Sequence, residues 1–234
     1  MADYYTEKLS AARLRRCYEL APPRVSRYLA AEIDHVRSHC GPRTRLLELG
    51  CGYGRVLAEL AQDCAEVIGV DTSYSSLREA RRFLGSFHNV GLVQQDAARL
   101  AFTNAAFDVA CCAQNGVSAF RRSPRILFAE ALRVVTPGGV CLFSTYTPAF
   151  WPERLEWFRR QSAEGLLGRI DEERTGDGVI VCRDGFRAVT PSAAELRAAA
   201  AGLSVEVSIR TVDDSSLFIE LRPDSNSTAG SAEL

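Results

Sequence analysis

Three glycines at alternate positions are the first feature of this sequence that points to chemistry. They lie within residues 46–55, which read LLELGCGYGR and begin with a short apolar segment. Glycine accepts positive φ angles and lets the backbone approach a ligand closely. If a helix begins at Arg55, its first N–H groups are available to a polar or anionic group. The spacing therefore predicts a strand, a tight ligand-binding loop and a helix, in that order.

Two acidic residues follow the next two apolar segments. Asp71 ends residues 67–71, and Asp96 follows residues 90–94. A carboxylate after the second strand can accept hydrogen bonds from both hydroxyls of a ribose, and one after the third strand can accept from an adenine amino group. Each residue can instead cap a helix or a turn, and the sequence leaves both interpretations open.

A nicotinamide dinucleotide is one ligand that such a loop could bind. The dinucleotide fingerprint is G-x-G-x-x-G, whose third glycine allows close packing of the helix on the strand. The sixth position here is Arg55. An NAD-dependent oxidoreductase is therefore the less favoured reading of the loop.

Strand-like and helix-like segments alternate around these residues. Apolar strands that alternate with helices predict parallel strands covered on both faces, joined by right-handed crossovers. An Asp184-Gly185 pair between two β-rich runs predicts a hairpin at residues 179–189. The strands are expected at residues 45–49, 66–70, 90–94, 107–112, 140–146, 204–210 and 216–221, and the helices at residues 3–18, 24–38, 55–63, 73–84, 125–134, 153–164 and between Pro191 and Gly202.

The order and spacing of these motifs resemble the class I S-adenosylmethionine-dependent methyltransferases. The resemblance covers about residues 43–146, from the LELGCGYG loop to the segment EALRVVTPGGVCLFS. It implies an α/β fold with a doubly wound seven-stranded sheet, mostly parallel with an antiparallel last strand between the fifth and sixth. It also implies S-adenosyl-L-methionine as cofactor and S-adenosyl-L-homocysteine as product. The cofactor-binding residues implied by the resemblance are Glu48, Gly50, Cys51, Gly52, Gly54, Asp71, Thr72, Asp96, Ala97 and Gln114.

The remaining segments divide the chain around this core. An N-terminal helical arm and cap is expected at residues 1–40, and the cofactor-binding core at residues 41–146. A helix–hairpin insertion after the fifth strand, residues 147–190, is expected to serve as a substrate lid. The C-terminal helix and strand pair, residues 191–223, would return to the core, and a disordered tail would follow at residues 224–234.

The loop after the fourth strand indicates the class of acceptor. Members of the family that methylate base or glutamine amino groups carry Asn-Pro-Pro-Tyr there, whereas this chain has residues 113–116, Ala-Gln-Asn-Gly. The resemblance is therefore to enzymes with small-molecule acceptors, which align nucleophile, methyl carbon and sulfur for in-line displacement. Whether N, O, C or S receives the methyl group stays open, and no general base is identified. Candidate acceptor-pocket residues are Tyr5, Tyr18, Asn115, Tyr146 and Trp151.

Two further functions remain as alternatives. Cys111-Cys112 and Cys182 raise the possibility of a thiol or metalloid (arsenic-type) methyltransferase, although adjacent strand residues point to opposite faces. A non-catalytic S-adenosylmethionine-binding subunit is the other alternative. The retained glycine loop and the acidic residues after the second and third strands argue against it.

Composition limits the partners and the compartment. The chain of 234 residues has 28 basic and 29 acidic residues, a net charge of -1 without a basic surplus, so nucleic acid is not expected as a partner. No apolar run reaches the ~18 residues of a membrane span, and residues 1–10 lack the apolar core of a signal peptide. We expect a cytoplasmic monomer or homodimer without a membrane partner.

The cysteines and histidines do not predict a metal site. The eight cysteines are scattered without a C-x-x-C pair, as expected for buried thiols in a reducing compartment. His35 and His39 stand one helical turn apart, where a solvated helix face is the simpler reading. No metal is expected.

Overall fold

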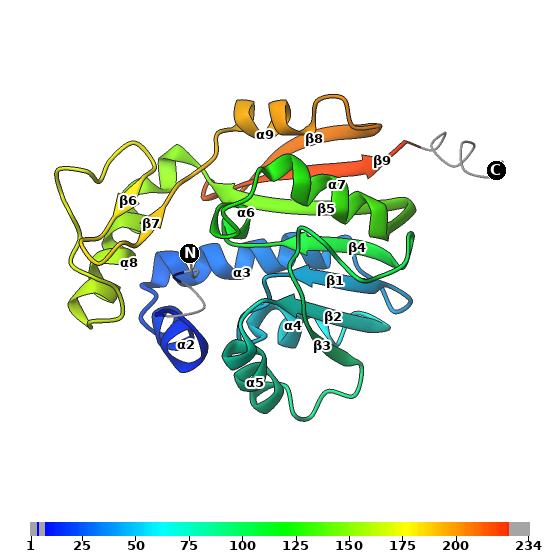
Figure 1. Cartoon of the computed structure of the whole chain (residues 1–234), viewed down its shortest axis with the longest axis horizontal. Coiled ribbons are helices and arrows are strands. Elements are labelled where there is room, and N and C mark those ends of the chain that lie inside the picture. Colours follow the sequence, from blue (N-terminus) through cyan, green and yellow to red (C-terminus); the bar gives the residue numbers. More distant parts are fainter. Residues whose placement is uncertain (1–3, 5–7, 225–234) are drawn as a thin grey trace.

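A seven-stranded sheet is the centre of the structure, a computed structural model that describes residue 4 and residues 8–224 (Figure 1). Its strand order is β3-β2-β1-β4-β5-β9-β8. The pairs β1/β2, β2/β3, β1/β4 and β4/β5 are parallel, and β9 is antiparallel to both β5 and β8. The strands are β1 (Arg45–Leu49), β2 (Glu66–Asp71), β3 (Val90–Gln94), β4 (Phe107–Cys112), β5 (Val135–Tyr146), β8 (Val205–Val212) and β9 (Ser216–Pro223). The predicted doubly wound sheet with an antiparallel last strand is confirmed.

Helices cover both faces of this sheet because successive strand residues point to opposite sides. On β1, Leu46 packs in one apolar cluster with α3, α4 and α5, while Leu47 packs in another with α7 and α9. Both side chains are fully buried. The helices are α2 (Ala11–Glu19), α3 (Pro23–Arg37), α4 (Arg55–Leu60), α5 (Tyr74–Phe83), α6 (Gly116–Ala119), α7 (Pro124–Val134), α8 (Trp151–Ala163) and α9 (Ala193–Ala200), with a 3₁₀ turn η1 at Pro148–Phe150.

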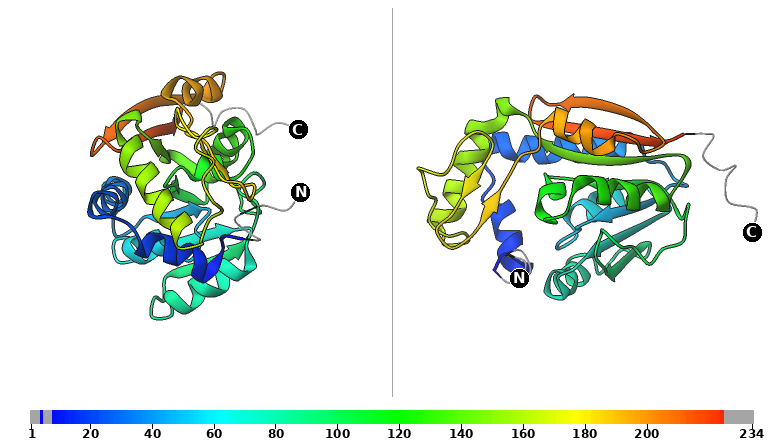
Figure 2. Two further views of the ribbon diagram at one scale, coloured as in Figure 1. Left: turned by 90° about the vertical axis from the view of Figure 1, so that its left-hand side faces the viewer. Right: turned by 45° about the horizontal axis from the view of Figure 1, so that its top comes forward.

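The arm and the insertion lie beyond the carboxyl ends of the parallel strands (Figures 1 and 2). Helix α8 and the hairpin of β6 (Ile180–Val181) and β7 (Arg187–Ala188) share an apolar cluster with the arm. Tyr4, Cys17, Trp157 and Phe186 are among its buried members. The segments are therefore packed into one body above the edge of the sheet where ligands bind in this fold class.

Several element boundaries differ from the sequence predictions. Helix α2 begins at Ala11, well after the predicted start, because the chain turns at residues 8–10. Helix α6 was not predicted. Strand β5 begins at Val135, before its predicted start at residue 140, and a register shift between Phe107 and Val109 of β4 accommodates residues 136–139. The predicted tail lies outside the described residues, apart from Asp224.

Among the described residues, no helix combines the length and apolar character needed to cross a bilayer. The eight cysteines are all free.

Candidate functional site

A cavity of about 170 Å³ opens at the carboxyl ends of β1, β2 and β4. Its floor is the glycine loop and the loop after β4, and its roof comes from α2, α8 and β7. Most of the predicted site residues line it. Those in the wall are Glu48, Gly50, Cys51, Gly52, Asp71, Thr72 and Gln114 from the cofactor set, and Tyr18, Asn115 and Tyr146 from the acceptor set.

The glycine loop owes its shape to positive φ angles. Gly50, Gly52 and Gly54 have φ angles of 74°, 54° and 86°. A Cβ atom on Gly52 would lie 2.9 Å from Leu14 Cδ2 of the arm, and one on Gly54 would lie 2.5 Å from Leu84 Cδ1. Glycine is thus required at both positions. Leu14 of α2 lies close to Gly52, and α5 packs closely against Gly54.

Asp71 connects the glycine loop to the next helix. Its Oδ2 accepts a hydrogen bond from the Gly52 N–H at 2.9 Å, and its Oδ1 accepts from the Ser73 N–H at 2.8 Å. The N-cap of α5 is nevertheless Ser73 and not Asp71, because the Ser73 hydroxyl accepts a hydrogen bond from Ser76 N–H. Asp71 therefore fixes the loop geometry while its carboxylate lines the cavity.

Glu48 places a buried carboxyl group at the same end of the cavity. Only 4% of the residue is exposed. Burial raises the pKa of Glu48 to about 8, Arg55 opposes this rise and the Asp71 carboxylate adds to it. A carboxyl group with this pKa is mostly protonated at neutral pH, and a cation entering the cavity would favour its charged form.

The loop after β4 adopts a conformation that non-glycine residues rarely take. Gln114 and Asn115 both have φ of 58°. Buried Glu32 of α3 holds the first through a 2.9 Å hydrogen bond accepted from Gln114 N–H, and accepts another from the Ser216 hydroxyl at 2.7 Å. Burial raises the pKa of Glu32, and these hydrogen bonds oppose the rise. Strain of this kind persists where the surroundings determine the backbone, as functional sites often require.

Asn115 is a structural bridge as well as a wall residue. Its Nδ2 donates to Val189 O at 2.8 Å, and its Oδ1 accepts from the Thr145 hydroxyl at 2.9 Å and from the Ser118 hydroxyl at 3.1 Å. The side chain thus ties the loop to β5 and to the end of the insertion.

The arm and the insertion are joined directly above the cavity. The Tyr4 hydroxyl donates to Asp184 Oδ2 at 2.5 Å, and Lys8 Nζ donates to Asp184 O at 2.9 Å. The Trp157 indole N–H donates to Cys17 O at 2.8 Å. Tyr18, a wall residue, lies with its ring centroid 5.8 Å from that of Trp157. These contacts make one roof from two segments far apart in the sequence.

An aromatic and cationic group borders the other end of the cavity. The Tyr146 ring lies 5.4 Å from the Tyr28 ring, and the Arg154 guanidinium lies 4.4 Å from the Tyr146 centroid. Burial raises the pKa of Tyr146, and the positive charge of Arg154 opposes this rise. Tyr146 is therefore a neutral phenol at neutral pH.

Five predicted residues are not in the described wall. Gly54 packs against α5, Ala97 is buried in the apolar core, and Trp151 contacts the core that joins arm and insertion. Asp96 accepts from Ala98 N–H at 2.9 Å and forms a 3.0 Å ion pair with Arg122. Tyr5 lies outside the described residues.

Three wall or supporting residues were missed by the sequence analysis, namely Glu32, Arg55 and Arg154. Glu32 interrupts the apolar stripe of α3, and Arg154 interrupts that of α8 between Trp151 and Phe158. A charged residue at an apolar position of a helix is a signal that can be read from sequence. Arg55, which stands where the dinucleotide fingerprint has its third glycine, also lines the cavity.

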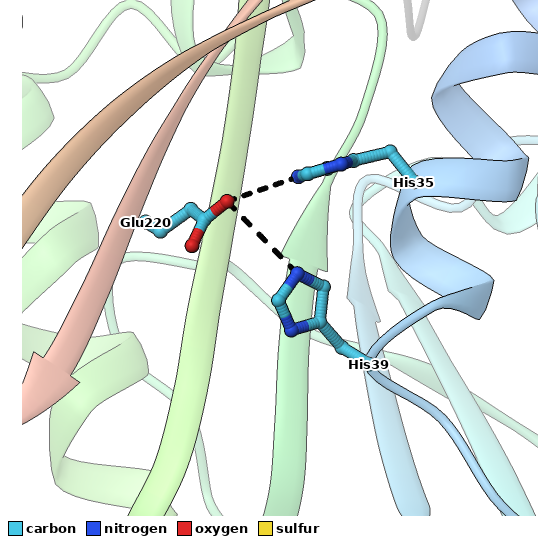
Figure 3. A group of neighbouring side chains, drawn as sticks. All are labelled: His35, His39 and Glu220. Atoms are coloured by element: carbon cyan, nitrogen blue, oxygen red, sulfur yellow. Dashed lines mark ion pairs between the residues drawn. The ribbon is translucent and has the colours of Figure 1, made fainter.

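His35, His39 and Glu220 form a separate polar cluster between α3 and β9 (Figure 3). Both imidazoles point toward Glu220 Oε1, with His35 Nε2 at 3.2 Å and His39 Nε2 at 3.9 Å. Arg210 Nε lies 2.9 Å from the same oxygen. Burial lowers the pKa of both histidines. These residues join helix to sheet, so the expectation of a solvated helix face is wrong for them.

The cysteines named for metalloid chemistry do not converge. Cys111, Cys112 and Cys182 belong to three different apolar clusters, and burial raises the pKa of each thiol. Cys51 is the one cysteine in the described part of the cavity wall. The three cysteines named for this chemistry therefore do not form a set of thiolates around one site.

Comparison with known proteins agrees with this architecture. A family model described as a methyltransferase domain matches residues 46–139. The malonyl-[acyl-carrier protein] O-methyltransferase of Legionella pneumophila is 33% identical over 139 residues, which cover 58% of this chain and 48% of the relative. The demethylmenaquinone methyltransferase of Clavibacter sepedonicus is 36% identical over 107 residues, covering 43% and 42%. The chain thus spans about half the length of these curated relatives.

A solved structure extends the similarity in fold beyond the matched domain. The PH0226 protein of Pyrococcus horikoshii aligns with a TM-score of 0.64 at 19% identity, covering 94% of this chain and 97% of that one. The similarity in fold to this structure therefore extends to segments of the chain outside residues 46–139. Residues 46–139 thus match the methyltransferase-domain family, and the sheet order is that of the class I S-adenosylmethionine-dependent methyltransferase fold.

Proposed function

We propose that this protein transfers the methyl group of S-adenosylmethionine to a small organic acceptor. The observation that carries the proposal is the cavity itself, which joins the glycine loop and Asp71 to a roof made by the arm and the insertion. The end of the cavity at Glu48 and Asp71, the cofactor end, has polar groups suited to a cofactor. The end at Tyr146 and Arg154, the acceptor end, has aromatic and cationic groups from segments outside residues 46–139, and it would bind the acceptor.

At the cofactor end of the cavity, different residues contact different parts of the cofactor. Glu48 faces the ammonium group directly or through water, and the backbone of Gly50, Cys51 and Gly52 surrounds the methionine part. Asp71 and the adjoining Thr72 bind the ribose. Gln114 reaches the cofactor from the loop that Glu32 holds.

Asp96 is the proposed adenine contact, with Ala97 beside it. Its ion pair with Arg122 is 40% and 54% exposed at the two side chains, and exposed pairs of this kind contribute little stability. Replacing Arg122 by an adenine amino group as the partner of Asp96 would therefore cost little free energy. The flanking Gly54 supports the loop through its packing on α5.

The transfer step needs alignment and exclusion of water more than acid–base help. A nucleophilic atom of the acceptor attacks the sulfonium methyl carbon in line, the carbon–sulfur bond breaks, and its electron pair stays on sulfur to give S-adenosylhomocysteine. A proton on an oxygen, nitrogen or sulfur nucleophile passes to solvent. Tyr146 is protonated at neutral pH and orients the acceptor as a hydrogen-bond donor rather than removing a proton.

The names of the relatives support methyl transfer without choosing the acceptor. One is named for malonyl-[acyl-carrier protein] and the other for demethylmenaquinone. Because the family model covers residues 46–139 and the roof segments lie outside that range, the acceptor of this chain depends on its own roof residues. No specific feature of the described cavity favours a thiol or metalloid methyltransferase, and none favours a non-catalytic S-adenosylmethionine-binding subunit.

Two measurements test the proposal. Calorimetric titration with S-adenosylhomocysteine and with NAD distinguishes the cofactors, and we expect binding of the first alone. Turnover of S-adenosylmethionine is then measured against a library of hydroxy, amino and thiol compounds, with Gly52→Val as the inactive control. Binding without turnover on any acceptor would favour the non-catalytic alternative, and absence of binding would contradict the proposed function.

A further inference from the structure

The cavity has an uneven distribution of charge along its wall. Among the described wall residues, only Glu48 and Asp71 are acidic, and both follow or belong to the strands at the cofactor end. The insertion contributes two arginines, Arg154 from α8 and Arg187 from β7. Arg55 also lines the cavity, but it lies near Glu48 and opposes the rise of that residue's pKa. The acceptor end is therefore positively charged.

Arg154 is held in one orientation. It is 1% exposed and is the largest fully buried side chain in the described part of the chain. Its Nη1 donates to Gly178 O at 2.9 Å and to Thr190 Oγ1 at 2.5 Å. The guanidinium also lies over the Tyr146 ring. A planar guanidinium fixed in this way is preorganised to bind an oxyanion through two parallel hydrogen bonds.

Arg187 lines the same cavity in a different manner. It is exposed on the short strand β7, whose neighbour Phe186 is buried in the cluster that anchors the hairpin. Its backbone is thus fixed while its guanidinium retains freedom. Such a residue can close over a ligand that the fixed arginine has already oriented.

We propose that the acceptor is a small acid, and that Arg154 and Arg187 bind its carboxylate or phosphate group. The inference rests on the proposed function, because it concerns the acceptor end of the same cavity. The acid group anchors the molecule and is not itself the methylated atom. A guanidinium that binds the oxyanion lowers its nucleophilicity, so the methyl group goes to a second nucleophile of the acceptor, directed toward the cofactor end.

The tryptophans provide a direct binding signal. The chain has two, Trp151 and Trp157, and both lie on α8. The Trp151 ring centroid is 5.7 Å from the Arg154 guanidinium. An anion bound at Arg154 should therefore change the intrinsic fluorescence, which allows titration without knowing the natural acceptor.

The test uses benzoate, phenyl phosphate and the neutral isostere benzamide, titrated into the full chain saturated with S-adenosylhomocysteine. We expect one or both acids to bind at least about tenfold more tightly than benzamide. Arg187→Ala should weaken acid binding about tenfold and leave the affinity for S-adenosylhomocysteine unchanged. The matched control is Arg183→Ala, because Arg183 is exposed on the same hairpin but is not a wall residue of this cavity. The preferred acid distinguishes carboxylate from phosphate.

Three results would overturn the inference: benzamide binding as tightly as the acids, wild-type acid affinity in Arg187→Ala, or no acid binding at all. Arg154→Lys adds a second variant that keeps the charge but loses the planar fork, and it should also weaken acid binding. Failure of S-adenosylhomocysteine to bind would instead contradict the proposed function. The acid titrations repeated on the unliganded protein would then decide the arginine site separately.

Discussion

Cofactor binding should release a proton from Glu48. Its carboxyl group is buried beside the glycine loop, and burial raises its pKa to about 8. At pH 7 such a group is about 90% protonated. An opposite charge at close range lowers a carboxyl pKa by about 1–3 units, so the cofactor ammonium should bring it to about 6 and leave about 10% protonated. The expected release is about 0.8 proton per cofactor bound.

The sign of the pH dependence follows from this release. Because binding expels a proton, affinity should increase as pH rises, by roughly tenfold between pH 6 and pH 7.5. The assay is calorimetric titration with S-adenosylhomocysteine at pH 7 in buffers of different ionisation enthalpy, where the slope of observed heat gives the number of protons. Glu48→Gln cannot release this proton and should show a slope near zero.

The explanation is wrong if the wild-type heat does not depend on the buffer. It is equally wrong if Glu48→Gln releases as many protons as the wild type. In either case the carboxyl group would be ionised before the cofactor arrives, or the cofactor would bind elsewhere.

Four other changes have defined outcomes. Asp71→Ala should weaken S-adenosylmethionine binding by about 1.5–3 kcal/mol, measured by calorimetry, because it removes a charged hydrogen-bond partner and frees the Gly52 N–H. Gly52→Val should abolish binding with only a modest fall in Tm, because a β-branched residue resists positive φ and meets the roof; retained binding would show that the loop does not touch the cofactor. Removal of the residues before Pro22 should spare cofactor binding but eliminate methyl transfer, and hydrogen exchange in the arm should slow when cofactor is added; a wild-type transfer rate would disprove the lid. His35→Gln should reduce the loss of stability on acidification, since a histidine pKa lowered by folding makes stability fall as pH drops through about 6.5; unchanged acid unfolding would exclude that histidine.

Local signals were sufficient to predict the sheet and the glycine loop. Apolar segments, the glycine loop and the acids after two strands are each short-range features, and the structure places Asp71 and the loop in one wall. The predicted hairpin formed at Asp184-Gly185, where Gly185 has φ of 98°. Capping chemistry was equally local, since Ser192 and Glu195 form the capping box of α9.

The acceptor end depends on contacts between distant residues, which no local pattern encodes. Asn115 was identified as a pocket residue, but its hydrogen bond to Val189 O requires the insertion to be in place. Arg154 reaches the cavity only because Thr190 and Gly178 position its guanidinium. Its place on an apolar helix face was visible in the sequence, whereas the cavity it faces was not.

The Glu32 contact has a consequence for when the protein becomes competent during synthesis. Glu32 holds Gln114 at the cavity, and its other oxygen is held by Ser216, 184 residues later in the chain. Ser216 begins β9, which must insert between β5 and β8 to complete the sheet. Long-range pairing of this kind forms late, and an emerging chain folds from its N-terminus. A nascent chain that has already exposed the glycine loop thus lacks a finished cavity until β9 has left the ribosome.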